Sequence, residues 1–199
     1  MAAEDRVDNR KEHGKIAEYP PLAALGRRIC IIGPSNSGKS TLAHMLAQKL
    51  DVPVVHLDAL RHIPNTAWKT RPLEEFVAAH DAAIAGEGWV MDGNYSSGLP
   101  QRLERATGVI WIDPPLWGCI GRYLKRCLKG KENRYGGLEG ATREFSFELI
   151  HYSVTQYPKK KPKYAAMIAA RPALPFIYLT SMKHLNALYT AWDIPCFIK

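Results

Sequence analysis

Residues 28–41 read RICIIGPSNSGKST, an apolar run followed by a glycine-rich turn and the start of a helical pattern. The turn fits GxxxxGK[ST] in the context of strand before and helix after that this motif requires. Its glycines allow backbone conformations that turn successive N–H groups toward phosphate oxygens, and the following helix adds the positive end of its dipole. We therefore predict a nucleotide-binding phosphate loop. It consists of Gly33, Pro34, Ser35, Asn36, Ser37, Gly38, Lys39, Ser40 and Thr41.

Two side chains of this loop predict the cofactors. Lys39 supplies a mobile positive charge for the β- and γ-phosphates of a nucleotide. Ser40 offers a hydroxyl to a Mg²⁺ ion that bridges the same phosphates. The sequence thus predicts ATP and Mg²⁺ as the bound groups.

Around the loop, short apolar runs alternate with stretches of helical length. We expect strands at 29–32, 52–57, 89–91, 109–112 and 176–179, and helices at 39–50, 73–85, 98–106, 116–128, 143–170 and 182–192. This alternation predicts an α/β fold with a parallel sheet that helices cover on both faces. The prolines in the tract 158–163 are expected to break or kink the helix around them.

Length and composition favour one globular domain. The chain has 199 residues, of which 46% are hydrophobic and 23% charged, and four scattered cysteines without zinc-ligand spacing. Residues 1–26 lack hydrophobic periodicity and are interpreted as a flexible leader before a domain at 27–199. No apolar run approaches the roughly 18 residues that cross a bilayer. We expect a cytoplasmic protein with no membrane partner, as a monomer or homodimer.

The net charge of +8 is concentrated in one segment. Residues 117–163 contain eleven basic and four acidic side chains. Such a segment is typical of contact with phosphates, either on a small nucleotide or on a nucleic-acid backbone, and a solvated helix face is the competing interpretation.

Acidic residues follow two of the expected strands, where ligands of parallel sheets bind. Asp92 follows the strand at 89–91 and is predicted to hold Mg²⁺ or its waters. Asp58 follows the strand at 52–57 and is predicted to orient the acceptor or take its proton, with a helix N-cap as the alternative. Asp113 precedes two prolines, which favours a turn or cap, and His56 is expected to be a buried strand residue.

The phosphate loop and Gly88-Trp89-Val90-Met91-Asp92-Gly93 together resemble the adenylate-kinase-like branch of P-loop kinases. More narrowly, the chain resembles the small bacterial DNA topology modulation proteins, which are predicted nucleotide or nucleoside kinases. The matching segments, within about 28–129, are the phosphate loop, His56-Leu57-Asp58, Trp68, Trp89-Val90-Met91-Asp92-Gly93-Asn94-Tyr95, Arg102-Leu103, Ile112-Asp113 and Arg122-Tyr123-Leu124-Lys125-Arg126.

This resemblance implies a three-layer α/β/α fold with a five-stranded parallel sheet of order 2-3-1-4-5. It also implies transfer of the γ-phosphoryl group of ATP to a small acceptor, such as a nucleoside, a nucleotide or a similar metabolite. Adenylate kinases have Pro-Arg after Asp-Gly, and this chain has Asn94-Tyr95 instead, which leaves AMP open as an acceptor. The candidates for the acceptor side are therefore Asp58, Tyr95, Arg102, Arg61 and Arg71.

The basic segment contains two arginines at helical spacing. Arg122 and Arg126 are four residues apart and share a helix face, like the lid arginines of adenylate-kinase-like enzymes. Beside Lys39 and Asp58, they are predicted to be catalytic, because guanidinium groups donate paired hydrogen bonds to a transferring phosphoryl group. The glycine-rich stretch at about 129–143 is predicted to form a mobile lid. An ATP-binding switch that associates with nucleic acid is the alternative function.

Overall fold

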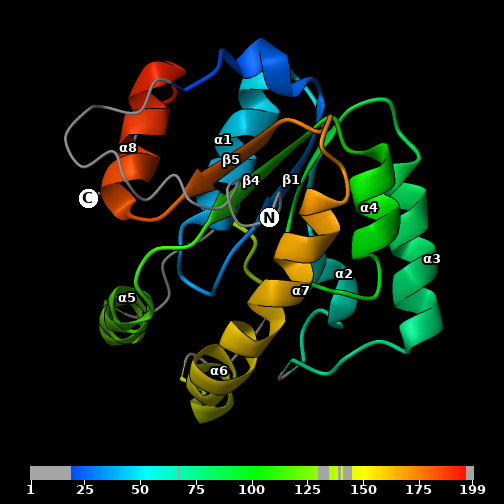
Figure 1. The fold of residues 1–199 in the computed structure, drawn as a ribbon. Coiled ribbons are helices and arrows are strands. Elements are labelled where there is room, and N and C mark those ends of the chain that lie inside the picture. Colours follow the sequence, from blue (N-terminus) through cyan, green and yellow to red (C-terminus); the bar gives the residue numbers. More distant parts are fainter. Residues whose placement is uncertain (1–18, 67, 130–134, 139, 141–144, 196–199) are drawn as a thin grey trace.

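The computed structural model describes residues 19–66, 68–129, 135–138, 140 and 145–195. Its centre is an all-parallel sheet of order β2-β3-β1-β4-β5 (Figure 1). All five predicted strands are present, and the predicted sheet order is confirmed. The strands are β1 Arg28–Ile32, β2 Val54–His56, β3 Trp89–Asp92, β4 Gly108–Ile112 and β5 Phe176–Leu179.

Helices cover both faces of the sheet because successive strand residues point to opposite sides. On one face, Ile29 and Ile31 of β1 belong to a core with the helices α1 (Lys39–Leu50) and α8 (Met182–Ala191). On the other face, Cys30 and Ile32 belong to a core with α3 (Leu73–Ile84), α4 (Leu99–Arg105) and α7 (Tyr157–Ala169). The remaining helical elements are η1 Leu22–Leu25, α2 Leu57–Arg61, α5 Leu116–Lys129, α6 Phe147–His151 and the π-helical turn η2 Tyr152–Gln156.

The helical stretch expected at 143–170 is divided differently from the prediction. Pro158 lies in the first turn of α7 and Pro162 inside it, and the helix continues to Ala169 through both. The irregular part is the wider π-helical turn that comes before Pro158. A proline lacks the N–H for the usual helical hydrogen bond, so the distortion lies on its N-terminal side. The short helix α2 was not predicted.

The described part of the predicted leader packs onto the core. Leu25 is fully buried, the Tyr19 hydroxyl donates to the carbonyl of His184 at 3.0 Å, and the Trp192 indole donates to the carbonyl of Pro20 at 2.8 Å. The folded part therefore includes residues 19–26, contrary to a leader that is flexible throughout 1–26. Residues 1–18 lie outside the described residues.

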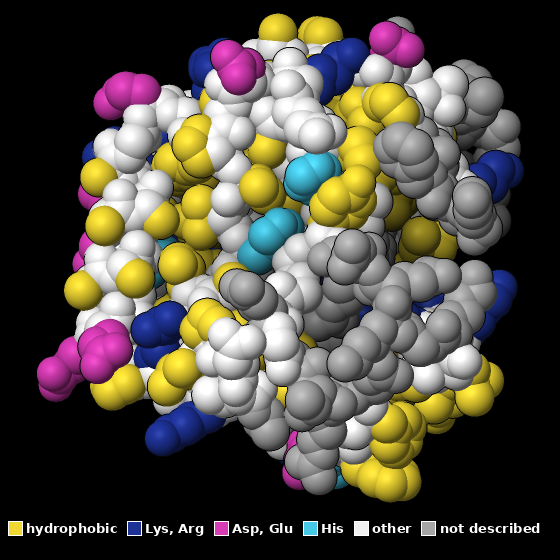
Figure 2. Space-filling view, turned by 180° about the vertical axis from the view of Figure 1, so that it is seen from behind, with side chains coloured by type: hydrophobic (Ala, Val, Ile, Leu, Met, Phe, Trp, Pro, Cys, Tyr) yellow, Lys and Arg dark blue, Asp and Glu magenta, His cyan; other side chains and the backbone are white. Residues whose placement is uncertain are grey.

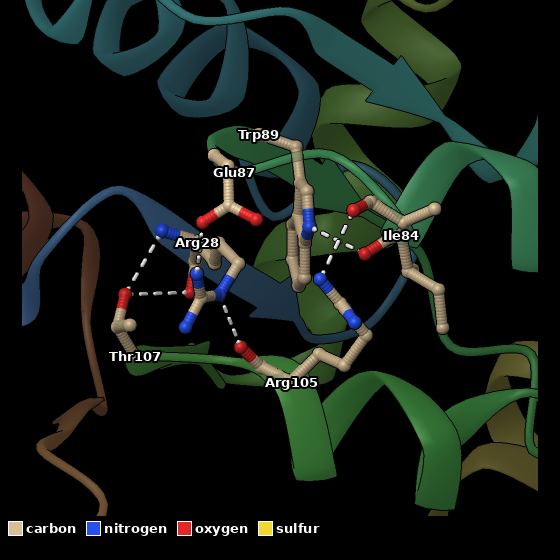
Figure 3. A network of polar contacts seen from close by, with 7 residues as sticks. Arg28, Ile84, Glu87, Trp89, Arg105 and Thr107 are labelled. Atoms are coloured by element: carbon tan, nitrogen blue, oxygen red, sulfur yellow. Dashed lines mark hydrogen bonds and ion pairs between the residues drawn. The ribbon is translucent and has the colours of Figure 1, made fainter.

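A polar network closes the edge of the sheet where the strands begin (Figure 3). Arg28 donates from Nε to the carbonyl of Arg105 and forms an ion pair with Glu87 at 3.6 Å. Thr107 bonds to both backbone groups of Arg28, and Arg105 donates to the carbonyl of Ala85 at 3.0 Å. The opposite edge, where the strands end, carries the phosphate loop. Across the described residues, no helix is both long enough and apolar enough to pass through a membrane.

Candidate active site

The phosphate loop connects β1 to α1, as predicted. Gly33, Asn36 and Gly38 all have positive φ angles, of 146°, 61° and 96°. At Gly33 a side chain is impossible because its Cβ would collide with the carbonyl oxygen of Ile112. The Lys39 ammonium lies over the loop and donates to the carbonyl of Pro34 at 2.7 Å. The loop thus has the strained backbone and the central cation that phosphate binding requires.

The environment of Lys39 combines burial with nearby acids. Burial lowers its pKa, whereas the charges of Asp92 and Asp58 oppose this shift. The charges of Asp92 and Asp58 thus both act on the Lys39 ammonium, and their common role in one site stays a prediction.

Ser40 and Asp92 meet beside the phosphate loop, where the sequence predicts Mg²⁺. The Ser40 hydroxyl donates to Oδ2 of Asp92 at 2.7 Å, and Asp92 is only 5% exposed. A hydroxyl and a carboxylate are the hard oxygen ligands that Mg²⁺ takes, while water and phosphate oxygens supply the rest of its shell. The described residues contain no cluster of three or more His, Cys, Asp or Glu that could enclose an ion. The pair therefore fits Mg²⁺ held jointly with a nucleotide.

His56, the one histidine that the sequence places near a predicted site residue, contacts Asp92 from the end of β2. It ends β2 opposite Asp92 in the sheet register, and its Nδ1 lies 2.5 Å from Oδ1 of Asp92. Strand pairing brings the two ends together, so the signal in the sequence is a polar residue at the end of each of two neighbouring strands. His56 thus holds one oxygen of Asp92 while Ser40 holds the other.

Asn94 fastens the first glycine of the phosphate loop. Its Oδ1 accepts from the N–H of Gly33 at 2.9 Å, and its Nδ2 donates to the carbonyl of Gly33 at 2.5 Å. The backbone carbonyl of Asn94 accepts from the Tyr164 hydroxyl at 2.7 Å. Asn94 is not among the site residues that the sequence predicts. Its position directly after Asp92-Gly93 was the available signal.

Asp58, Tyr95 and Arg61 lie together on the predicted acceptor side. Asp58 is the second residue of α2, and its Oδ1 accepts from the Tyr95 hydroxyl at 2.7 Å. The N-cap alternative is wrong, because His56 occupies the cap position. Burial, followed by the charge of Asp58, raises the pKa of Tyr95. The Arg61 guanidinium lies 5.8 Å from the centre of the Phe76 ring.

Two other acceptor candidates have different positions. Arg71 contacts the acceptor side through its backbone, because its carbonyl oxygen accepts a hydrogen bond from the Arg61 guanidinium. Arg102 is only 1% exposed and donates to the carbonyls of Gly93 and Tyr95 at 3.3 and 2.8 Å. Arg102 is thus enclosed and fixes the loop after β3, which corrects its prediction as a contact for the acceptor. Burial also lowers its pKa.

Of the two predicted lid arginines, Arg122 reaches the phosphate loop. It donates from Nε to the carbonyl of Asn36 at 2.9 Å and from Nη2 to Sγ of Cys119 at 3.2 Å. The Arg126 guanidinium lies 5.1 Å from the centre of the Tyr123 ring. The two side chains therefore serve different contacts, although they share a helix face. Arg134, Arg143 and most of the predicted lid lie outside the described residues.

The described part of the predicted lid lies against His44, His56 and Ser40. Tyr135 stacks on His44 with ring centres 3.9 Å apart. Gly136 has a φ of 69°, and a Cβ there would lie 2.8 Å from Nδ1 of His56 and 3.1 Å from Cβ of Ser40. This segment thus packs on the pair of residues that flank Asp92.

Asp113 binds α7 to the ends of β4 and β5. Its carboxylate accepts from the hydroxyls of Tyr157 and Tyr178 at 3.0 and 2.6 Å and pairs with Lys161 at 2.5 Å. The sequence analysis favoured a turn or cap for Asp113 and missed this network, because α7 is distant in sequence.

Two lysines of the basic tract in α7 have partners within the protein. Lys161 pairs with Asp113, and Lys160 donates to the Tyr152 hydroxyl at 3.1 Å. Lys159 and Lys163 are exposed. On the face seen in Figure 2, visible Lys and Arg side chains are scattered and do not gather in one patch. Nucleic-acid binding through 117–163 remains a prediction.

Comparison with solved structures gives a neighbour with the same fold. A gluconokinase from Sinorhizobium meliloti is 15% identical and superposes with a TM-score of 0.50, over 85% of this chain and 91% of its own. A shikimate kinase from Bacteroides thetaiotaomicron is 19% identical, with a TM-score of 0.46 over 82% of this chain and 96% of its own. A sugar kinase from a Janibacter species is 18% identical, with a TM-score of 0.45 over 84% and 95%. The chain has the three-layer fold of P-loop kinases.

Sequence comparison gives a relative that matches only part of the chain. The phosphonates import ATP-binding protein PhnC of Pseudomonas entomophila is 29% identical over 128 residues, which are 64% of this chain. The chain spans only 36% of the length of that relative. No protein-family model matches the chain. The narrower resemblance to adenylate kinases and DNA topology modulation proteins therefore stays a prediction.

Proposed function

We propose that this protein is a phosphotransferase that moves the γ-phosphoryl group of ATP to a small acceptor in the presence of Mg²⁺. The observation that carries the proposal is the arrangement around Lys39. The Ser40 hydroxyl donates to Asp92 at 2.7 Å, and the charges of both Asp92 and the exposed Asp58 act on the Lys39 ammonium. A site that only holds nucleotide needs the first pair and has no use for the second carboxylate.

On the donor side, each residue has a role that follows from its position. The loop N–H groups and the dipole of α1 bind the phosphates, and Lys39 balances the charge of the β- and γ-phosphates. Arg122, which contacts the loop at the carbonyl of Asn36, would donate to the transferring group. When bound by Ser40 and Asp92, Mg²⁺ would neutralise charge that develops between the β- and γ-phosphates.

Room for the rest of the nucleotide adjoins the loop. A pocket begins at Pro34 of the loop and is lined further by Pro115, Leu116 and the Asp113–Lys161 ion pair. Its proline and leucine side chains offer apolar contact for a nucleobase, and its charged pair offers polar partners for a sugar. The likeness to a gluconokinase supports the same reaction class, since that protein is by name a kinase of a small molecule. A nucleoside, a nucleotide or a related metabolite is the acceptor that the sequence favours.

Acceptor-dependent ATP turnover by the purified chain tests this proposal. The protein is incubated with Mg-ATP and a panel of nucleosides, nucleoside monophosphates, sugars and sugar acids, and ADP and phosphorylated product are both quantified. Lys39→Ala should abolish product. Lys49→Ala is the matched control, because Lys49 lies at the far end of the same helix and pairs with Asp193. ATP binding without product from any acceptor would contradict a kinase and favour a nucleotide switch.

A further inference from the structure

The acceptor side presents a carboxylate with one oxygen available. Tyr95 holds Oδ1 of Asp58 at 2.7 Å, and Oδ2 has no hydrogen-bond partner within the part of the chain that the structure describes. Asp58 is exposed, so it remains accessible to a ligand. Tyr95 is in turn packed on Phe76, with ring centres 5.2 Å apart. Asp58 is thus an exposed hydrogen-bond acceptor that the Tyr95 hydroxyl orients.

This carboxylate distinguishes between two kinds of acceptor atom. A nucleoside monophosphate attacks with a phosphate oxygen, which carries negative charge and needs no base. A carboxylate beside that oxygen would repel it. An alcohol attacks with a neutral oxygen whose proton must leave, and a carboxylate within hydrogen-bond reach accepts that proton. The position of Asp58 therefore favours an alcohol.

Arg61 adds a positive charge one helical turn from Asp58. The two residues are three apart in α2, so they lie on one face of this helix. The Arg61 guanidinium is fixed by the carbonyl of Arg71 and by the Phe76 ring. A guanidinium has five N–H donors, and only the bond to Arg71 engages one of them in the described structure. The others can bind a carboxylate or phosphate in a bidentate manner.

We propose that the acceptor is an alcohol that carries its own anionic group, with the hydroxyl on Asp58 and the anion on Arg61. This inference rests on the proposed phosphotransferase function and specifies its substrate class. In the transfer step, the acceptor oxygen forms a bond to the γ-phosphorus, and the bond from that phosphorus to the β–γ bridging oxygen breaks. ADP leaves, and the acceptor's proton passes to Oδ2 of Asp58. Hydroxycarboxylic acids and sugar phosphates both have the required chemistry.

A matched acceptor panel tests the class directly. Gluconate has a carboxylate where sorbitol has a hydroxymethyl group, and glucose 6-phosphate has a phosphate that glucose lacks. AMP and adenosine form the nucleotide pair. Further hydroxy acids and their neutral polyols extend the series. ³¹P NMR distinguishes a phosphate monoester from a phosphoanhydride. We expect a monoester on an anionic alcohol, with a KM about 10-fold or more below that of its neutral counterpart. The carboxylate and phosphate arms identify which anion is bound.

The outcomes separate this inference from the function on which it rests. A Lys39-dependent phosphoanhydride formed on AMP would overturn the inference and leave the phosphotransferase in place. A monoester made equally well from charged and neutral alcohols would refute the role of Arg61. If ATP binds and no acceptor is phosphorylated, both proposals fall together.

Variants of the two residues provide a second test. Arg61→Met should raise KM about 10- to 100-fold for the anionic acceptor without changing KM for its neutral counterpart, and Arg61→Lys should restore part of the loss. Arg105→Met is the matched control, since Arg105 also donates to a backbone carbonyl but at the opposite edge of the sheet (Figure 3). Equal effects of Arg61→Met on both acceptors would indicate a purely structural role.

For the carboxylate, Asp58→Asn should lower kcat about 100-fold or more with little effect on ATP binding, because the amide cannot take the proton. Glu74→Gln is the control, as Glu74 is an exposed carboxylate in the first turn of α3. An unchanged kcat would exclude Asp58 as the base.

Discussion

Replacing Asn94 by alanine should loosen the phosphate loop at its first glycine. The Asn94 side chain makes two hydrogen bonds to Gly33, one to its N–H at 2.9 Å and one to its carbonyl at 2.5 Å. Gly33 itself is buried, so water cannot fully replace the lost partners. Its peptide groups lie where the loop leaves β1, and their position determines how the following N–H groups point.

The expected magnitude follows from these two bonds. Each contributes about 1 kcal/mol net, and an unpaired buried backbone group adds a desolvation cost of about 1 kcal/mol or more. We expect Asn94→Ala to lower the free energy of unfolding by about 3 kcal/mol. For a chain of this length, the melting temperature should fall by about 6–12 °C. The affinity for Mg-ATP should fall as well, because the binding conformation of the loop is less populated.

Urea unfolding and calorimetric titration with a non-hydrolysable ATP analogue measure the two effects. Tyr164→Phe is the control, because it removes only the bond from the Tyr164 hydroxyl to the backbone carbonyl of Asn94. This control should cost about 1 kcal/mol of stability and leave nucleotide affinity nearly unchanged. An Asn94→Ala protein with wild-type stability and affinity would refute the idea that this side chain holds the loop.

Gly33→Ala should prevent the phosphate loop from adopting its conformation, because a Cβ would collide with the carbonyl oxygen of Ile112. We expect urea unfolding to show a free energy of unfolding at least about 3 kcal/mol lower, and wild-type stability would contradict the loop geometry. His80 is buried, which lowers its pKa below the ordinary 6.5, so its protonation favours the unfolded chain. The free energy of unfolding should therefore fall as pH drops below about 6.5, and His80→Gln should flatten the profile measured by denaturant titration at several pH values. Burial raises the pKa of the Cys30 thiol to about 11, so a thiol reagent should modify the partly exposed Cys127 in the native protein and Cys30 only on unfolding, as mass spectrometry of the labelled peptides would show.

Local patterns in the sequence were sufficient for most of the fold. The five apolar runs and the stretches between them correctly predicted the strands and nearly all the helices, because burial on both faces makes parallel strands continuously apolar. The division of 143–170 into α6, η2 and α7 was not predicted. Its cause is the geometry of two prolines within a helix that is stabilised by packing, and sequence rules treat prolines as breaks.

The positions of the glycine-rich loop, Ser40 and Asp92 could be predicted because they depend on residues close in sequence or at strand ends. His56 and Asn94 were missed as members of the site, and Arg102 was assigned to the acceptor although it is enclosed. For these residues the identity of the side chain gave no information about its partner. An arginine after a strand is equally compatible with an exposed anion site and with a buried contact to carbonyls.

The sequence by itself determined the α/β fold and the glycine-rich loop between β1 and α1, because both depend on hydrophobic periodicity and on a short run of residues whose backbone geometry is local. Only the tertiary structure decided which side chains meet across the carboxyl edge of the sheet. Strand register brings His56 to Asp92, and the turn after β3 carries Asn94 to Gly33 and Tyr95 to Asp58. These contacts join residues 36 to 61 positions apart in the chain. Their geometry follows from how the layers pack, which no local sequence pattern records.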